Sequence, residues 1–163
     1  MQPEEIILLP PIHLVGVSLR HRMTNPQTHH LWKSFRPRVG EIEGRLGGDF
    51  YSVTVLDHAQ GERLSDLNPA MEYQQWAAVL VDPAAPVPNG LERLTLLEAW
   101  YAKFIHHGPA HRFGHTIQQI LQVWLPSSRY QLAPHPNFEI MGPDYRVDAP
   151  DAQEEVYIPV VKS

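Results

Sequence analysis

Two stretches in the last quarter of the chain decide the fold: PNFEIM (residues 136–141) and EEVYIPV (residues 154–160). The first alternates with a period of two, which predicts a β-strand with Phe138 and Ile140 on one face and Glu139 and Met141 on the other. A carboxylate among strand-forming apolar residues must either face solvent or lie in a partly dry pocket, where it would hold a proton or attract a cation. We therefore expect function to depend on a pocket at Glu139.

The second stretch also predicts a strand, and its two faces differ in character. Val156, Ile158 and Val160 form an apolar stripe suited to packing under a helix. Tyr157 lies on the other face together with Pro159, which has no N–H to donate and so indicates an edge position or a chain end.

Outward from these strands, the same order of elements is predicted twice. Asn25-Pro26 predicts a helix start, and Pro37 its end. Turn-rich stretches over 57–69 and 82–90 separate the remaining elements. The expected strands and helices are a strand over 6–9 and 13–19, a helix beginning at 25–26, strands over 51–56 and 73–81, a strand over 94–106, a helix over 113–125, and strands over 138–141 and 155–161.

This order predicts an α+β fold in one domain, residues 1–163, with duplicated strand-helix-strand-strand units as pseudo-repeats over about 6–82 and 91–161. Side by side, two such units give one antiparallel sheet with two helices on one face. The opposite, concave face is then expected to hold a ligand groove between the repeats. The aromatic residues of the helices, which must face the sheet, are interpreted as core: Trp32, Phe35, Phe113 and Trp124.

Composition excludes several function classes. The chain has 18 acidic and 13 basic side chains, a formal charge of −5, and no Lys/Arg block, so no direct contact with nucleic acid is expected. A scattered basic cluster is interpreted as solvated: Arg20, Arg22, Lys33, Arg36 and Arg38. The amino terminus lacks the features of a secretory signal, and no run approaches the length of a membrane span, so a cytoplasmic protein with no membrane partner is expected.

The spacing of three histidines could indicate a metal site, but the surrounding sequence argues against it. His107, His111 and His115 step by four, but Gly108-Pro109 places His107 before the helix, and no nearby Asp, Glu or Cys completes a ligand set. The chain has no cysteine, which excludes a thiolate nucleophile. We expect no metal and no cofactor.

Seven stretches in order resemble the GyrI-like superfamily of small-molecule-binding domains, also found as the effector-binding half of AraC-type and MerR-type regulators. They are LVGVSLR (14–20), LWKSF (31–35), YSVTV (51–55), YAKFIHHGP (101–109), WLPSSRY (124–130), PNFEIM (136–141) and EEVYIPV (154–160). The resemblance implies a duplicated fold with an aromatic-lined groove and a buried glutamate that attracts lipophilic cations. It places that glutamate on Glu139 and the aromatic walls on Tyr101, Phe104, Tyr157, Tyr51, Trp76 and Trp100.

Three hypotheses follow from the residues and the resemblance together. The first is a free-standing sensor or sequestering protein that binds small lipophilic or cationic aromatic compounds around Glu139. The second is a hydrolase of strained cyclopropane-containing compounds, with Glu139 as general acid or base and Tyr101 or Tyr157 orienting the nucleophile. The third is an interaction module for a transcription or gyrase partner. No helix-turn-helix is expected ahead of a first strand that begins within about ten residues of Met1, so any contact with DNA would require a protein partner.

Overall fold

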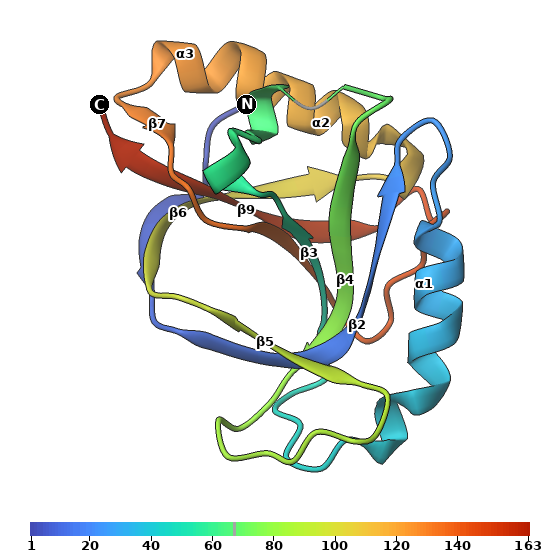
Figure 1. Cartoon of the computed structure of the whole chain (residues 1–163). Coiled ribbons are helices and arrows are strands. Elements are labelled where there is room, and N and C mark those ends of the chain that lie inside the picture. Colours follow the sequence, from blue (N-terminus) through green and yellow to red (C-terminus); the bar gives the residue numbers. More distant parts are fainter. Residues whose placement is uncertain (67) are drawn as a thin grey trace.

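The computed structural model describes residues 1–66 and 68–163, in which a curled antiparallel sheet carries helices on its outer face (Figure 1). Residue 67, within the turn-rich stretch predicted over 57–69, lies outside the described part. The strands are β1 (Glu5–Leu9), β2 (Ile12–Arg22), β3 (Phe50–Val55), β4 (Glu72–Leu80), β5 (Glu92–Leu96), β6 (Ala99–His107), β7 (Tyr130–Leu132), β8 (Asn137–Met141) and β9 (Gln153–Lys162).

The helices follow the predicted positions closely. They are α1 (Thr28–Phe35), α2 (Phe113–Gln119) and α3 (Leu125–Ser127), with a π-helical segment η5 (Ile120–Trp124) that joins α2 to α3. Short 3₁₀ turns complete the list: η1 (Arg36–Glu41), η2 (His58–Gln60), η3 (Leu64–Asp66) and η4 (Ala110–Arg112).

The sheet has the order β1-β6-β9-β8-β3-β4-β2-β5, with β7 paired to β9. The order strand-helix-strand-strand occurs twice, as β2-α1-β3-β4 and as β6-α2-β8-β9, which confirms the predicted α+β fold with duplicated units. The units meet where β3 pairs with β8, with Ser52 opposite Glu139. The strand ahead of each unit pairs with the other unit: β1, ahead of the first, pairs with β6, and β5, ahead of the second, pairs with β2.

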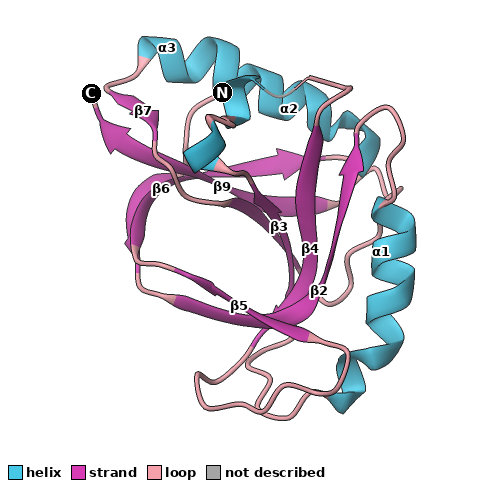
Figure 2. Ribbon diagram, in the orientation of Figure 1, coloured by secondary structure: helices cyan, strands magenta, loops and turns pink. Residues whose placement is uncertain are grey.

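Helix α1 and the segment formed by α2, η5 and α3 lie on the outer face of the curl (Figure 2). Each of the two covers a separate hydrophobic core. Under α1, the side chains of Leu31 and Phe35 pack on Val15 and Val79 of the sheet. Under α2 and η5, the core contains Phe104, Ile120, Trp124 and the predicted stripe of Val156, Ile158 and Val160. The stripe therefore packs under a helix, as its alternation predicted.

The inner face of the curl is filled by aromatic and aliphatic side chains. Its cluster includes Tyr51, Trp76, Tyr101, Phe138 and Tyr157, each at most 7 % exposed. Leu14, Leu96 and Ala99 join them from strands near the two ends of the sheet. The expectation that this concave face would hold the ligand groove is corrected here: curling brings both ends of the sheet onto the same aromatic layer, which becomes a core.

The chain differs from the sequence prediction at three breaks. The stretches 6–9 and 13–19 form two strands with different partners, because Pro10-Pro11 interrupts them. The single strand predicted over 94–106 is likewise divided, into β5 and β6. Helix α1 begins at Thr28, and Asn25 instead pairs with Arg22 in a tight turn.

Pro159 was predicted at an edge position or a chain end; it lies near the end of the chain, in a strand that has neighbours on both sides. On one side of β9, pairing with β8 ends at Tyr157 and pairing with β7 begins at Val160. Pro159 falls between these partners, where a missing backbone N–H removes no ladder hydrogen bond.

No helix within the described residues is long and apolar enough to cross a membrane.

Candidate functional site: a cleft between the two helices

A cleft runs along the outer face of the sheet between α1 and the start of α2. It consists of two joined cavities, of about 300 Å³ and about 520 Å³, that share Thr28, Trp32, Ala110, Met141, Tyr145 and Val147. The smaller cavity reaches the sheet and is called the acid end here; it also contains Ser52, Thr54, Tyr73, Gln75, Phe113, Glu139 and Glu154. The larger cavity is called the basic end; it also contains His29, Lys33, Arg36 and Phe50.

Strand register places Glu139 at the acid end. Glu139 pairs with Ser52 of β3 and with Val156 of β9, and directly paired residues share a face of the sheet. Val156 belongs to the helix-facing core, so Glu139 faces the same side. At this junction of the duplicated units, Glu139 lines the acid end together with Thr28 and Trp32 of α1 and Phe113 of α2.

The Glu139 carboxyl group lacks compensation for its lost hydration. Its Oε2 atom is inaccessible to solvent and has no hydrogen-bond partner in the structure. Burial, and secondarily the charge of Glu154, raises the pKa of Glu139 well above the usual glutamate value. The group therefore holds a proton more readily than an exposed glutamate, and its ionised form would gain strongly from a cation.

Glu154 is the second carboxyl group at the acid end. It is 7 % exposed and lies two residues from Val156, in phase with the helix-facing stripe of β9. Burial raises its pKa, while the Tyr145 hydroxyl and the cross-strand neighbour His106 oppose the rise. The imidazole of His106 is itself fixed, with Nδ1 2.7 Å from Thr116 Oγ1 and Nε2 donating to the Pro109 carbonyl.

A hydrogen-bonded network fixes the polar floor of the acid end. The Thr28 hydroxyl donates to Gln75 Oε1 over 3.0 Å, and Gln75 Nε2 donates to the Ser52 hydroxyl over 3.0 Å. The start of α1 is held by His21, whose Nδ1 accepts from the Gln27 N–H at 2.8 Å. These contacts tie α1 to β2, β3 and β4 beside Glu139.

Aromatic side chains form the walls. Trp32 of α1 and Phe113 of α2 both line the acid end, as do Tyr73 and Tyr145. Burial raises the pKa of Tyr145, as does the nearby charge of Glu154. Ring faces beside carboxylates are a favourable environment for organic cations.

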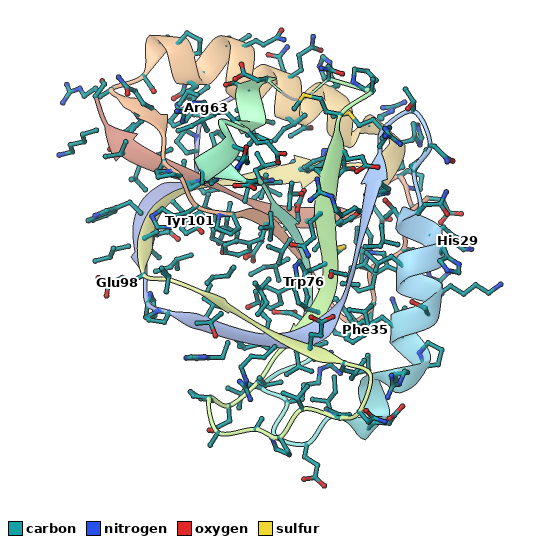
Figure 3. All side chains as sticks on the ribbon, in the orientation of Figure 1. His29, Phe35, Arg63, Trp76, Glu98 and Tyr101 are labelled. Carbon is teal, nitrogen blue, oxygen red and sulfur yellow. The ribbon has the colours of Figure 1, made fainter. Side chains whose placement is uncertain are left out.

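Four of the predicted aromatic residues lie on the opposite face of the sheet from Glu139. Tyr51, Trp76, Tyr101 and Tyr157 belong to the inner cluster, and Figure 3 shows Trp76 and Tyr101 inside the curl, with His29 on α1 outside it. The Tyr101 hydroxyl donates to the Pro136 carbonyl, and the Tyr157 hydroxyl donates to Glu155 Oε1. Burial raises the pKa of Tyr51 to about 12, with smaller contributions from Asp49 and Glu155.

The two remaining predicted residues lie elsewhere again. Phe104 is fully buried and packs edge-on against Trp124 at 5.1 Å, beneath η5. Trp100 is 51 % exposed and borders a separate hollow of about 550 Å³ with Ile6 and Tyr130. Of the predicted site residues, only Glu139 is therefore in the cleft.

The residues that accompany Glu139 were missed or assigned to the core. Phe35 and Trp124 are core as predicted. Trp32 and Phe113, also interpreted as core, pack against the two helix-covered cores and line the cleft as well. The sequence carried one signal for Glu154: it has the same alternation phase as Val156, Ile158 and Val160, and is the charged residue at the start of this apolar, helix-facing stripe. Tyr73 and Tyr145 carried no comparable signal, because a loop position and a strand end have no fixed phase.

Within residues 1–66 and 68–163, no group of three or more His, Asp or Glu side chains is arranged to hold a metal ion.

The model of the GyrI-like small molecule binding domain matches residues 2–161, so the chain belongs to this family. It is thus a small-molecule-binding domain, and the resemblance seen in the sequence is confirmed. No curated protein sequence matches the chain.

Solved structures share the fold at low sequence identity. SAV2435 bound to tetraphenylphosphonium matches with a TM-score of 0.70 and 15 % identity, over 99 % of this chain and 94 % of that one. The EcmrR C-terminal domain matches with a TM-score of 0.69 and 14 % identity, over 98 % and 97 %. In a complex of EcmrR with DNA, the chain spans only 57 % of the EcmrR chain, with a TM-score of 0.69, 12 % identity and 98 % of this chain covered.

A hydrolase from Listeria innocua matches with a TM-score of 0.58 and 13 % identity, over 98 % of this chain and 92 % of that one. The shared fold therefore occurs in a protein solved with DNA, in a protein solved with an organic cation and in a hydrolase. At such identities these likenesses establish the fold alone.

Proposed function

We propose that the chain binds lipophilic cations in the cleft, with the Glu139 carboxylate as the counter-charge. The observation that carries this proposal is the buried Glu139 Oε2 atom, which has no hydrogen-bond partner. A cation that entered the acid end would supply the compensation that the carboxylate lacks. Among the described residues that line the acid end, none is Lys, Arg or His, so no side chain there competes for this role.

The size and the walls of the cleft fit the same class of ligand. Cavities of about 300 Å³ and about 520 Å³ fall in the range that small organic ligands occupy. Trp32, Phe113 and Tyr145 present rings on which a cation can stack. The binding of tetraphenylphosphonium by SAV2435, which shares the fold, supports this ligand class.

Tetraphenylphosphonium is the direct probe, with the fluorescence of Trp32 as the reporter at the site. We expect micromolar affinity, about −8 kcal/mol. Glu139→Gln keeps the shape and removes the charge, so it should weaken binding at least about tenfold while leaving the neutral analogue triphenylphosphine oxide nearly unaffected.

Glu155→Gln is the matched control, because it removes the same charge from the inner face of the sheet, where Glu155 accepts from Tyr157. It should leave the phosphonium affinity unchanged. Equal weakening by both substitutions would reduce the role of Glu139 to net charge and would refute the proposal.

The cellular role that we attach to this binding is sensing or sequestration. EcmrR, whose C-terminal domain shares the fold, has been solved in complex with DNA, which supports a link between such domains and transcription. In a chain of this kind, α1 contributes Trp32 and Thr28 to the cleft, so an occupied cleft would fix the position of α1 for a partner. The DNA-contacting or gyrase-contacting role then belongs to that partner.

A hydrolase of strained rings is the second candidate, and the same orphaned carboxyl group favours it. A protonated Glu139 could donate to an opening ring, or its carboxylate could accept a proton from an attacking water. Tyr101 and Tyr157 lie on the opposite sheet face and cannot orient that water; Tyr73 and Tyr145 are the tyrosines at the acid end. Product from cyclopropane-bearing or epoxide-bearing compounds, lost in Glu139→Gln, would support this candidate, and intact recovery of all of them would exclude it in practice.

A further inference from the structure

The cleft has opposite charges at its two ends. The acid end contains Glu139 and Glu154, whereas the basic end is lined by His29, Lys33 and Arg36. These three basic residues recur at helical spacing. His29 and Lys33 of α1, with Arg36 directly after its last turn, therefore form a stripe that faces the cleft. Trp32 lies between the two ends and borders both cavities.

The guanidinium group of Arg36 is held at the cleft. It lies 4.5 Å from the centre of the Phe50 ring, and both side chains line the basic end. Arg45 lies 4.9 Å from the same ring, which adds a further positive charge beside it. In the part of the chain that the structure describes, neither Lys33 nor Arg36 forms an ion pair with an acidic side chain.

The spacing of the two ends sets the length of a ligand that could reach both. Thr28 belongs to the acid end and Arg36 to the basic end, and eight residues of helix correspond to about 12 Å at 1.5 Å per residue. Lys33 lies nearer, at about 7–8 Å from Thr28 by the same measure.

We propose that the preferred ligands are elongated zwitterions, with a lipophilic cation at Glu139 and an anionic group, a carboxylate or a phosphate, at Lys33 and Arg36. This inference rests on the proposed cation binding and narrows its ligand class. A purely cationic ligand would satisfy Glu139 but would leave the basic stripe unpaired. Because Lys33 and Arg36 are exposed, the added preference is small, in the range of surface ion pairs.

A pair of probes that differ only in the anion tests the inference. (4-Carboxybutyl)triphenylphosphonium carries a carboxylate on a short chain, and its methyl ester lacks the negative charge. By calorimetric titration at low salt, the acid should bind the wild-type protein about three- to fivefold more tightly than the ester. High salt should reduce this ratio, because exposed charges are screened.

The variants assign the preference to the stripe. In Lys33→Gln/Arg36→Gln the acid and the ester should bind equally. The control Arg129→Gln/Lys162→Gln makes the same change in net charge at exposed positions outside the cleft and should keep the wild-type ratio.

Equal binding of both probes by the wild-type protein, or a preference that survives in Lys33→Gln/Arg36→Gln, would overturn the inference and leave cation binding intact. Failure of both phosphonium probes to bind would instead overturn the proposed function, and the inference with it.

Discussion

The two faces of the sheet use similar side chains for different purposes. On the inner face, Phe138 stacks on Tyr157, and Tyr101 packs edge-on against both rings. The hydroxyl groups of Tyr101 and Tyr157 each have a hydrogen-bond partner. On the outer face, Trp32 and Tyr145 border open space, and the Oε2 atom of Glu139 has no hydrogen-bond partner. Aromatic residues therefore mark a binding site only where the surrounding packing is incomplete. An orphaned polar atom helps to locate such a site when it borders open space, as Glu139 Oε2 does; the equally unpartnered Nε1 atom of Trp76 lies in the packed inner cluster.

The largest contrast is expected in stability. Phe138 is fully buried and stacks 4.7 Å from Tyr157, so Phe138→Ala should lower the free energy of unfolding by about 3–5 kcal/mol. Tyr145→Ala, in the cleft, should cost less than half as much, because the side chain is only partly buried. Chemical denaturation measures both values. A Phe138→Ala protein of wild-type stability that no longer bound tetraphenylphosphonium would place the ligand on the inner face.

The next contrast concerns pH. A free Glu139 with a raised pKa is protonated below that pKa, and a cation must displace the proton to bind. The affinity for tetraphenylphosphonium should therefore rise about tenfold per pH unit below the pKa and level off above it. Glu139→Gln should bind weakly at every pH.

Glu154→Gln sharpens the pH experiment. Because the charge of Glu154 helps to raise the pKa of Glu139, its removal should move the rise in affinity to lower pH. Titration of the wild-type protein over pH 4–8 that showed a flat profile would contradict the assignment of the counter-charge to a buried carboxylate.

The ionised Glu139 side chain should also lower the free energy of unfolding of the ligand-free protein, because its buried charge has no partner until a cation binds. The raised pKa means that the native chain retains a proton that the unfolded chain releases, so wild-type stability falls as pH rises from the usual glutamate pKa through the raised one. Above that window, Glu139→Gln should raise Tm by roughly 2–4 °C, the shift that about 1 kcal/mol produces in a chain of this length. At low pH the two proteins should melt together. A lower Tm for Glu139→Gln at high pH would indicate a carboxylate that is already compensated.

The smallest expected effects are at the tyrosines that the sequence proposed as pocket walls. Tyr101→Phe removes the bond to Pro136, and Tyr157→Phe removes the bond to Glu155. Each should cost about 0.5–1.5 kcal/mol of stability and leave phosphonium binding unchanged. A tenfold loss of binding in either variant would return these residues to the site.

Sequence periodicity predicted the layers of this fold well. The phase of Val156, Ile158 and Val160 placed a helix on them, and the phase of PNFEIM placed Glu139 on the face opposite Phe138. Both predictions hold because side chains alternate strictly along a strand. The same rule, applied across the pairing of β8 with β9, would have placed Glu154 beside Glu139.

The remaining errors have a common physical origin in tertiary pairing. The break between β5 and β6 at Leu97-Glu98 contains no Gly or Pro that would have predicted it. It arises because β5 pairs with β2 of the first unit, whereas β6 pairs with β1. The curl of the sheet, which turned the expected groove into a core, likewise depends on contacts between strands far apart in sequence. Local propensity carries no signal for either.

The most direct test of the account is a structure of the protein with tetraphenylphosphonium bound. We predict the phosphonium on the outer face of the sheet, within about 6 Å of the rings of Trp32 and Tyr145 and next to the Glu139 carboxylate, with the inner aromatic cluster unchanged. A ligand inserted among Tyr101, Phe138 and Tyr157, with Glu139 left uncontacted, would contradict it.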